Sequence, residues 1–200
     1  LPSMDLKTIT NSPRCPVGGL EHVDAALAKG KGLILALNHS GNWDMAGAWL
    51  VEHYGGFTTV AERLKPESLF ERFVAYRESL GFEVIPLTGG EQPPFPLLAQ
   101  RLRENKIICL LSERDLARHG VPVQFFGEQT RFVAGPARLA IETGATLLPV
   151  HSWFTEEDGV EGWGLSAYPP IDVSGGVQAA TQALADVFAN NIFDHAQDWH

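Results

Sequence analysis

Short runs of consecutive apolar residues alternate along this chain with segments of helical periodicity, and this alternation most restricts its possible folds. Residues 32–37 (Gly-Leu-Ile-Leu-Ala-Leu) and 106–112 are apolar at nearly every position, which is typical of strands buried on both faces. Strands are predicted over residues 32–37, 57–60, 82–86, 106–112, 145–154 and 165–168. Helices are predicted over residues 21–29, 43–54, 66–80, 95–105, 134–143 and 177–192. Residues 1–20, rich in proline and glycine, are expected to be a loop.

Strands that alternate with helices indicate an α/β fold with a mainly parallel central sheet flanked by helices. The 200 residues suffice for one domain with a substantial core, and we expect a single catalytic domain over 1–200. Because the chain begins at Leu1 without methionine, we expect its termini to be incomplete.

Composition excludes several classes of function. The net charge of −9 argues against a nucleic-acid partner, since phosphate binding needs clustered Lys and Arg. The two cysteines, Cys15 and Cys109, do not suggest a disulfide framework and indicate a reducing compartment. No apolar stretch is long enough to span a bilayer, and no leader segment is visible. A cytosolic chain with at most peripheral membrane contact is therefore expected.

The segment Leu37-Asn38-His39-Ser40-Gly41-Asn42-Trp43-Asp44 lies where a buried strand gives way to a helix. Ligands of open α/β sheets gather at the carboxyl ends of strands, so His39 stands where chemistry is expected. Asp44, in the first helical turn, could accept a hydrogen bond from one ring nitrogen and leave the other to take a proton from a substrate hydroxyl. No G-x-S-x-G motif supplies a serine nucleophile.

A simpler interpretation also fits this segment. His39 could cap the helix, and Asp44 could be a solvated carboxylate that the helix dipole favours. The spacing alone does not decide between a catalytic dyad and this structural role.

The same segment resembles the first motif of the glycerophosphate-type acyltransferase superfamily, a histidine followed after four residues by an acidic residue. Further resemblances follow in order, at residues 62–66, 77–81, 111–115, 123–127, 135–140 and 143–150. The Gly-Asn-Trp insert is similar to the branch that contains the bacterial lipid A late acyltransferases and the phosphatidylinositol mannoside acyltransferases of actinobacteria. The sequence of these motifs is most similar to that of the mannoside enzymes.

This resemblance implies a glycerol-3-phosphate acyltransferase-like fold and the transfer of a fatty acyl group, typically palmitoyl, from coenzyme A to a mannose of a phosphatidylinositol mannoside. It implies His39 as the base and Asp44 as its orienting partner, with no metal, no cofactor besides the acyl-CoA co-substrate, and no covalent acyl-enzyme. Substrate-binding roles fall to four charged residues: Glu62, Arg63, Arg77 and Glu113. A peripheral monomer at the cytoplasmic face of the plasma membrane is the corresponding expectation.

Other functions stay open at this point. The acceptor could be a lipid A precursor or a lysophospholipid, and the chain could instead be an acyl-CoA-binding module without activity. A metal-dependent hydrolase would use His39, Asp44, Glu113, Asp115 and His119 as ligands, but no ligand spacing such as H-E-x-x-H supports this hypothesis. Of the other histidines, His151 is expected to be a hydrogen-bonded core residue, His119 is expected to lie in a solvated loop, and no pattern assigns a role to His22, His53, His195 or His200.

Overall fold

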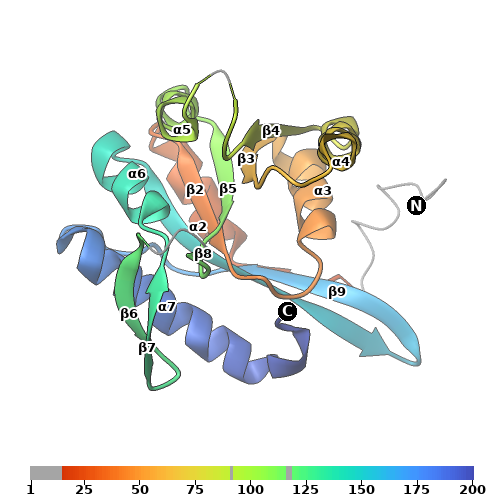
Figure 1. Ribbon diagram of the computed structural model, residues 1–200. Coiled ribbons are helices and arrows are strands. Elements are labelled where there is room, and N and C mark those ends of the chain that lie inside the picture. The colour runs from red at the N-terminus through yellow and green to blue at the C-terminus, as the bar shows by residue number, and fades with distance from the viewer. Residues whose placement is uncertain (1–14, 91, 116–118) are drawn as a thin grey trace.

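The computed structural model describes residues 15–90, 92–115 and 119–200 (Figure 1). Its strands are β1 (Val17–Gly18), β2 (Leu33–Leu37), β3 (Phe57–Ala61), β4 (Phe82–Pro86), β5 (Ile107–Leu111), β6 (Val121–Phe125), β7 (Glu128–Phe132), β8 (Thr146–Glu157) and β9 (Val160–Ala167). Its helices are α2 (Leu20–Ala28), α3 (Trp43–Tyr54), α4 (Glu67–Ser79), α5 (Pro94–Arg103), α6 (Gly135–Thr143), α7 (Gly176–Asp194) and the short 3₁₀ turn η1 (Ala196–Asp198).

Within these residues, seven strands form one sheet in the order β1-β9-β8-β2-β5-β3-β4. Strands β8, β2, β5, β3 and β4 run parallel to one another, whereas β9 returns antiparallel to β8. The prediction of a mainly parallel sheet flanked by helices is therefore confirmed. The carboxyl ends of the parallel strands lie along one edge, where ligands of such sheets usually bind.

The sheet separates two layers of helices, because side chains of a strand alternate between its faces. Leu33, Leu35 and Leu37 of β2 pack in the cluster that includes residues of α2, α3 and α4. Ile34 and Ala36 point to the opposite face and pack with residues of α5, α6 and α7. Both faces of β2 are thus buried, as the continuous apolar run predicts.

Two regions differ from the prediction. Residues 121–132, for which no strand was predicted, form the antiparallel hairpin β6–β7, which pairs outside the main sheet. Strand β8 extends to Glu157 because it pairs with β9 as far as Val160 in a long hairpin. Of the predicted N-terminal loop, residues 1–14 lie outside the described residues, and Val17–Gly18 pairs with β9 as a short strand.

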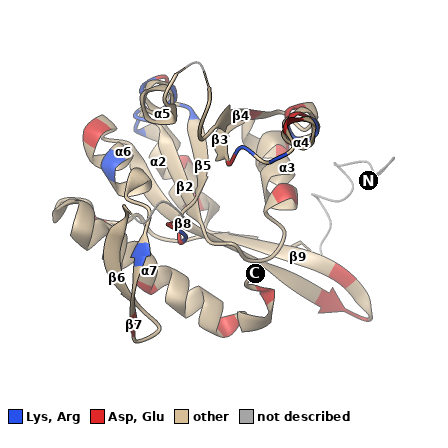
Figure 2. Ribbon diagram, in the orientation of Figure 1, with Lys and Arg blue, Asp and Glu red and all other residues tan. Residues whose placement is uncertain are grey.

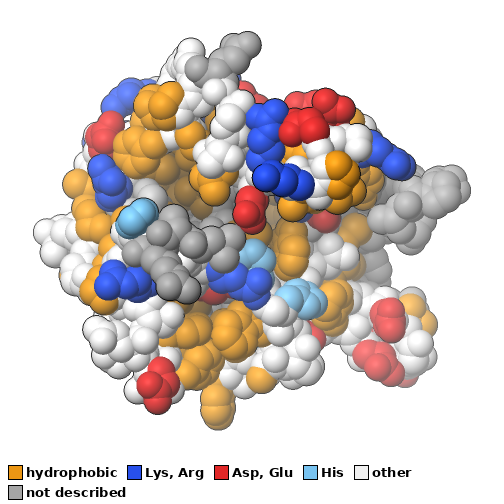
Figure 3. Space-filling view, viewed as in Figure 1, with side chains coloured by type: hydrophobic (Ala, Val, Ile, Leu, Met, Phe, Trp, Pro, Cys, Tyr) orange, Lys and Arg blue, Asp and Glu red, His pale blue; other side chains and the backbone are white. Residues whose placement is uncertain are grey.

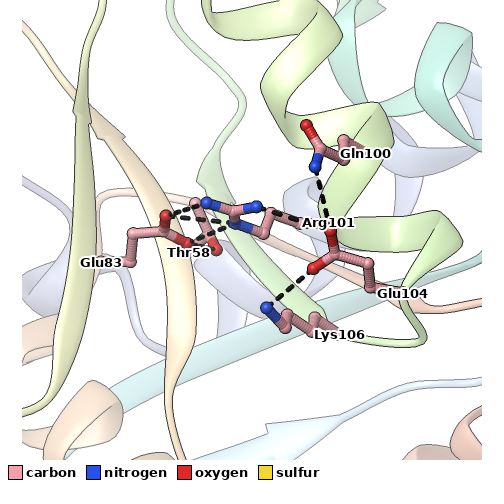
Figure 4. Close-up of polar contacts among 6 residues, drawn as sticks. All are labelled: Thr58, Glu83, Gln100, Arg101, Glu104 and Lys106. Atoms are coloured by element: carbon pink, nitrogen blue, oxygen red, sulfur yellow. Dashed lines mark hydrogen bonds and ion pairs between the residues drawn. The ribbon is translucent and has the colours of Figure 1, made fainter.

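A charged network joins β3, β4 and α5 at the end of the sheet opposite the carboxyl edge (Figure 4). Arg101 donates three hydrogen bonds from Nε and Nη2 to Glu83, at 2.6–3.1 Å, and Thr58 Oγ1 donates to the same carboxylate at 2.6 Å. Lys106 and Gln100 contact Glu104 beside it. Figure 2 shows further acidic residues at the tip of the β8–β9 hairpin.

Replacing Glu83 by glutamine is expected to reduce the loss of stability on acidification. The hydrogen bond from Arg101 lowers the pKa of Glu83, against the opposing effect of partial burial. A carboxyl whose pKa is lower in the folded state stabilises the fold at neutral pH, and this contribution disappears as the pH falls from the usual carboxyl pKa through the folded one. Thermal melts between pH 7 and pH 3 should show a shallower decline of the midpoint for Glu83→Gln than for the wild type. An equal decline would mean that the pair contributes nothing measurable, as is common for exposed ion pairs.

Candidate active site

His39 lies in a tight turn between β2 and α3. The turn is closed by the Ser40 N–H, which donates to the Asn38 carbonyl at 2.9 Å. Gly41 has a φ of 60°, and a Cβ at this position would lie 2.6 Å from the Ser152 backbone, so a side chain is excluded on both conformational and steric grounds. Asn42 then caps the helix by accepting from the Met45 N–H at 3.1 Å. The sequence therefore places a histidine at the carboxyl edge of the sheet and begins a helix immediately after it.

Glu113 lies directly beside His39 because β5 is the neighbour of β2. Leu37 is paired with Leu111, so the second residue after each of these two positions meets its counterpart across the strands. Glu113 Oε1 lies 2.6 Å from Nδ1 of His39 and also accepts the backbone N–H of His39 at 2.9 Å. The Glu113 side chain is 2% exposed and that of His39 21%, so the carboxylate is buried and the imidazole reaches the surface.

The negative charge of Glu113 determines which ring nitrogen of His39 carries the proton. Burial raises the pKa of Glu113, but the hydrogen bonds and the charge of His39 outweigh it, and the pKa is lowered overall. A carboxylate can only accept hydrogen bonds, so Nδ1 of His39 carries the proton in this contact. In the neutral ring Nε2 is then unprotonated and able to act as a base.

Asp44 does not occupy the position that the sequence analysis assigned to it. Asp44 Oδ1 lies 2.7 Å from Nη2 of Arg77, and no contact with His39 is found for it among the described residues. The reason is geometric: α3 begins at Trp43 and carries Asp44 away from the ring, whereas the neighbouring strand brings Glu113 against Nδ1. Arg77 is itself held at the end of α4, with its guanidinium 4.2 Å above the ring of Phe73.

Replacing Asp44 by asparagine is expected to lower the free energy of unfolding by about 1–3 kcal/mol, because the buried Arg77 guanidinium would lose its anionic partner. We expect a value in the lower half of this range, because the Asp44 side chain is 37% exposed and solvent screens its charge. Urea unfolding of Asp44→Asn beside the wild type measures the effect. A double variant that also carries Arg77→Met should recover part of the lost stability, and no recovery would contradict a role for the pair.

The other predicted site residues lie farther from His39 or make separate contacts. Glu62 is exposed just after β3, and Arg63 beside it is bound to Glu67 at 2.6 Å and to the Gly89 carbonyl at 2.7 Å. Asp115 accepts from the backbone N–H of Gly120, and His119 is exposed. In the described part of the chain, no three His, Cys, Asp or Glu side chains are grouped closely enough to hold a metal ion.

An apolar pocket opens beside the His39 turn and lies against the sheet face that α3 covers. Trp43 lines this pocket, and its ring centroid lies 5.5 Å from that of His39. Asp44 and Arg77 supply the polar part of its wall. The apolar lining comes from β2, α3, β3, β4 and β5 and includes Leu35, Leu37, Leu50, Phe57, Phe82 and Leu111. The pocket, of about 70 Å³, therefore suits a short hydrocarbon segment next to the imidazole.

A second, wider pocket of about 560 Å³ lies on the Glu113 side of the site. Arg114 and Arg131 give it cationic groups, and Phe125 and Trp199 give it aromatic walls. Figure 3 shows histidine side chains and blue side chains, the colour of Lys and Arg, next to a group of hydrophobic ones on this face of the molecule. The pocket is polar on one side and aromatic on the other, unlike the apolar pocket.

Sequence reasoning missed the C-terminal residues of this site. The backbone N–H of His200 donates to the His39 carbonyl at 2.9 Å, and the Gly41 N–H donates to the Asp198 carbonyl at 2.9 Å. The His200 ring contacts the Gly41 carbonyl through Nε2 at 3.1 Å and lies edge-on to Trp43. No local pattern signals these contacts, because they join segments about 160 residues apart.

A buried carboxylate that orients a histidine beside an apolar pocket can activate a hydroxyl group next to a bound hydrocarbon chain. Comparison with known proteins shows the family of the chain. The sequence pattern of the bacterial lipid A biosynthesis acyltransferases matches residues 2–200. The chain belongs to this acyltransferase family.

Within the family, the chain is similar to proteins named phosphatidylinositol mannoside acyltransferase. It is 61% identical over 201 residues to the one from Mycobacterium tuberculosis strain CDC 1551 / Oshkosh, and 62% identical over 201 residues to the one from Mycolicibacterium smegmatis. Both alignments include all of this chain, which spans 62% and 64% of the length of these relatives. None of the described helices is both long and apolar enough to cross a bilayer.

Proposed function

We propose that this chain carries the catalytic site of an acyltransferase. The enzyme moves a fatty acyl group, typically palmitoyl, from acyl-CoA to a mannose hydroxyl of a phosphatidylinositol mannoside. The observation that carries the proposal is the His39–Glu113 contact of 2.6 Å beside an apolar pocket. The acceptor is taken from the names of the relatives in the two mycobacterial species.

In the proposed reaction, Nε2 of His39 takes the proton of the acceptor hydroxyl as its oxygen attacks the thioester carbonyl carbon. Glu113, hydrogen-bonded to Nδ1, stabilises the imidazolium that forms. The new C–O bond creates a tetrahedral oxyanion, the C–S bond then breaks, and the leaving thiolate takes the proton from the imidazolium. The step uses no covalent acyl-enzyme.

In this proposal the two pockets bind different parts of the substrates, one the acyl chain and the other the polar groups. The apolar pocket, of about 70 Å³, would take the first methylenes of the acyl chain next to the thioester. Each methylene removed from water contributes about 0.8 kcal/mol to binding. The polar parts of the substrates, which bear phosphate and sugar groups, fit the wider pocket that Arg114 and Arg131 line. Glu113 borders this pocket and contacts His39, so the reacting atoms would meet between the two.

We further propose that the protein works at a membrane surface, at the cytoplasmic face of the plasma membrane. Phe126 and Trp199 are exposed, their ring centroids lie 6.2 Å apart, and Trp199 lines the wider pocket. Exposed aromatic residues of this kind favour the interface between lipid and water. Contact there would let a lipid acceptor reach His39 without leaving the bilayer.

The test is thiol release from palmitoyl-CoA in the presence of vesicles with and without a phosphatidylinositol mannoside. Release that depends on the mannolipid, with an acylated mannolipid as product, is the expected result. Sedimentation of the vesicles in the same samples reports whether the protein associates with them. Release without the mannolipid would replace the proposal by a thioesterase activity. Transfer only to a lipid A precursor or a lysophospholipid would assign a different acceptor.

A further inference from the structure

The turn that carries His39 rests on a chain of buried polar side chains. Asn38 and Ser40, on either side of His39, and His151 on β8 are each 1% exposed. Strands β2 and β8 are parallel neighbours with Leu37 paired with Val150, so Asn38 and His151 follow at matching positions. His151 Nδ1 lies 3.2 Å from Asn38 Oδ1, and Asn38 Nδ2 donates to Ser40 Oγ at 3.0 Å.

The direction of each hydrogen bond in this chain is determined. Asn38 donates through its amide nitrogen to Ser40, which leaves Oδ1 as the acceptor that faces His151. Burial, and then the charge of His195, lower the pKa of His151 to about 4, so the ring is neutral at physiological pH. A neutral ring has one donor, and the contact requires it at Nδ1. Nε2 of His151 is buried and has no hydrogen-bond partner among the described residues.

The turn is short, and His39 is at its apex. Its backbone closes from Ser40 N–H to the Asn38 carbonyl, and the Asn38 amide joins the same two residues through their side chains. A rotated Asn38 amide would present an N–H to His151 and its oxygen to Ser40, so the donor and acceptor of both contacts would have to exchange. The Asn38 amide thus links His151 to the turn whose apex carries the His39 ring, and that ring lies 2.6 Å from Glu113.

We propose that His151 is a positioning residue for the acyl-transfer reaction: it fixes the Asn38 amide, which in turn holds the turn that aims His39. This inference rests on the proposed function for its kinetic consequences. A shift of about 1 Å in a catalytic group can reduce the rate about 10²-fold, so a residue that touches neither substrate nor base can matter for turnover.

Two variants of His151 separate positioning from general packing. His151→Asn retains an N–H donor near the place of Nδ1, whereas His151→Phe retains the ring and its packing against Trp153 but has no donor. Phenylalanine removes only the Asn38 contact, since Nε2 has no partner among the described residues. We expect kcat to fall about 10- to 10²-fold in His151→Phe with little change in KM for the thioester, and to recover most of its value in His151→Asn. Equal kcat values in the two variants would overturn the proposal.

The Asn38→Ala background tests whether the effect passes through the amide. If His151 acts through Asn38, adding His151→Phe to Asn38→Ala should change kcat by less than about twofold, because the two residues belong to one chain of contacts. Independent, additive losses in this double-mutant cycle would show that His151 affects the rate in another way, and the proposal would fail. Thermal melts of all variants confirm that folded proteins are compared.

A spectroscopic measurement keeps this inference separate from the proposed reaction. The short Nδ1–H contact of His39 with Glu113 should give a low-field proton resonance, assigned by its absence in His39→Gln. We expect this resonance to shift or broaden in His151→Phe and to persist in His151→Asn, whatever the substrate is. An unchanged resonance in His151→Phe would contradict positioning. Failure of the wild type to transfer palmitoyl, with the resonance behaving as expected, would overturn the proposed reaction and leave the positioning role intact.

Discussion

Replacing His39 by glutamine is expected to lower kcat for thioester consumption about 10²–10⁴-fold, the usual contribution of a positioned general base. The glutamine amide can still bond to Glu113, but it has no basic nitrogen to take the proton of the acceptor hydroxyl. His39 lies at the surface end of the site with 21% of its side chain exposed, so the fold should tolerate the change. Thiol release from palmitoyl-CoA with the mannolipid, measured at saturating substrate, reports the effect.

His119→Gln is the matched control for this variant. His119 is an exposed histidine, and its replacement removes an imidazole without touching the contacts of His39. We expect its kcat to stay within about twofold of the wild type, as for surface substitutions away from the site. A His39→Gln protein that turns over at the wild-type rate would show that another group is the base.

Replacing Glu113 by glutamine is expected to lower kcat about 5- to 10-fold, because a hydrogen bond to a charged group contributes about 1.5–3 kcal/mol and a neutral one about 0.5–1.5 kcal/mol. The glutamine oxygen can still accept from Nδ1 and the backbone N–H of His39, so the geometry is preserved. What is lost is the negative charge that stabilises the imidazolium as the hydroxyl proton arrives. The same assay of thiol release measures the loss, and KM for the thioester should change little.

The comparison with Asp44→Asn decides which carboxylate orients the base. If Glu113 does so, Asp44→Asn should reduce kcat much less than Glu113→Gln while lowering stability more, because Asp44 is paired with the buried Arg77. If instead Asp44 moves onto His39 during the reaction, the two variants would show similar losses of kcat. The order of the two kcat values is therefore the decisive result.

The elements of the fold were predictable because their signals are local. Alternation and helical periodicity placed α3 over Trp43–Tyr54 and β4 over Phe82–Pro86 with the bounds that the structure has. The hairpin β6–β7 was not predicted, since most of its residues are exposed and it lacks a continuous apolar run. Its strands are stabilised by pairing with each other and by contact with α7, which no local pattern reveals.

For the site, the sequence by itself determined that a histidine stands at the carboxyl end of a buried strand, shortly before a helix whose first turn carries an acidic residue. Only the tertiary structure decided which carboxylate meets that histidine. Strands β3 and β4 precede β5 in the chain, yet β5 lies directly beside β2, so Glu113 reaches Nδ1 while Asp44 pairs with Arg77. The position of His151 behind Asn38 and that of His200 against the His39 carbonyl depend equally on the order and register of distant segments. Periodicity depends on residues that are close in sequence. Strand order is set by how all the apolar faces pack together, and the sequence of a single strand does not specify its partner.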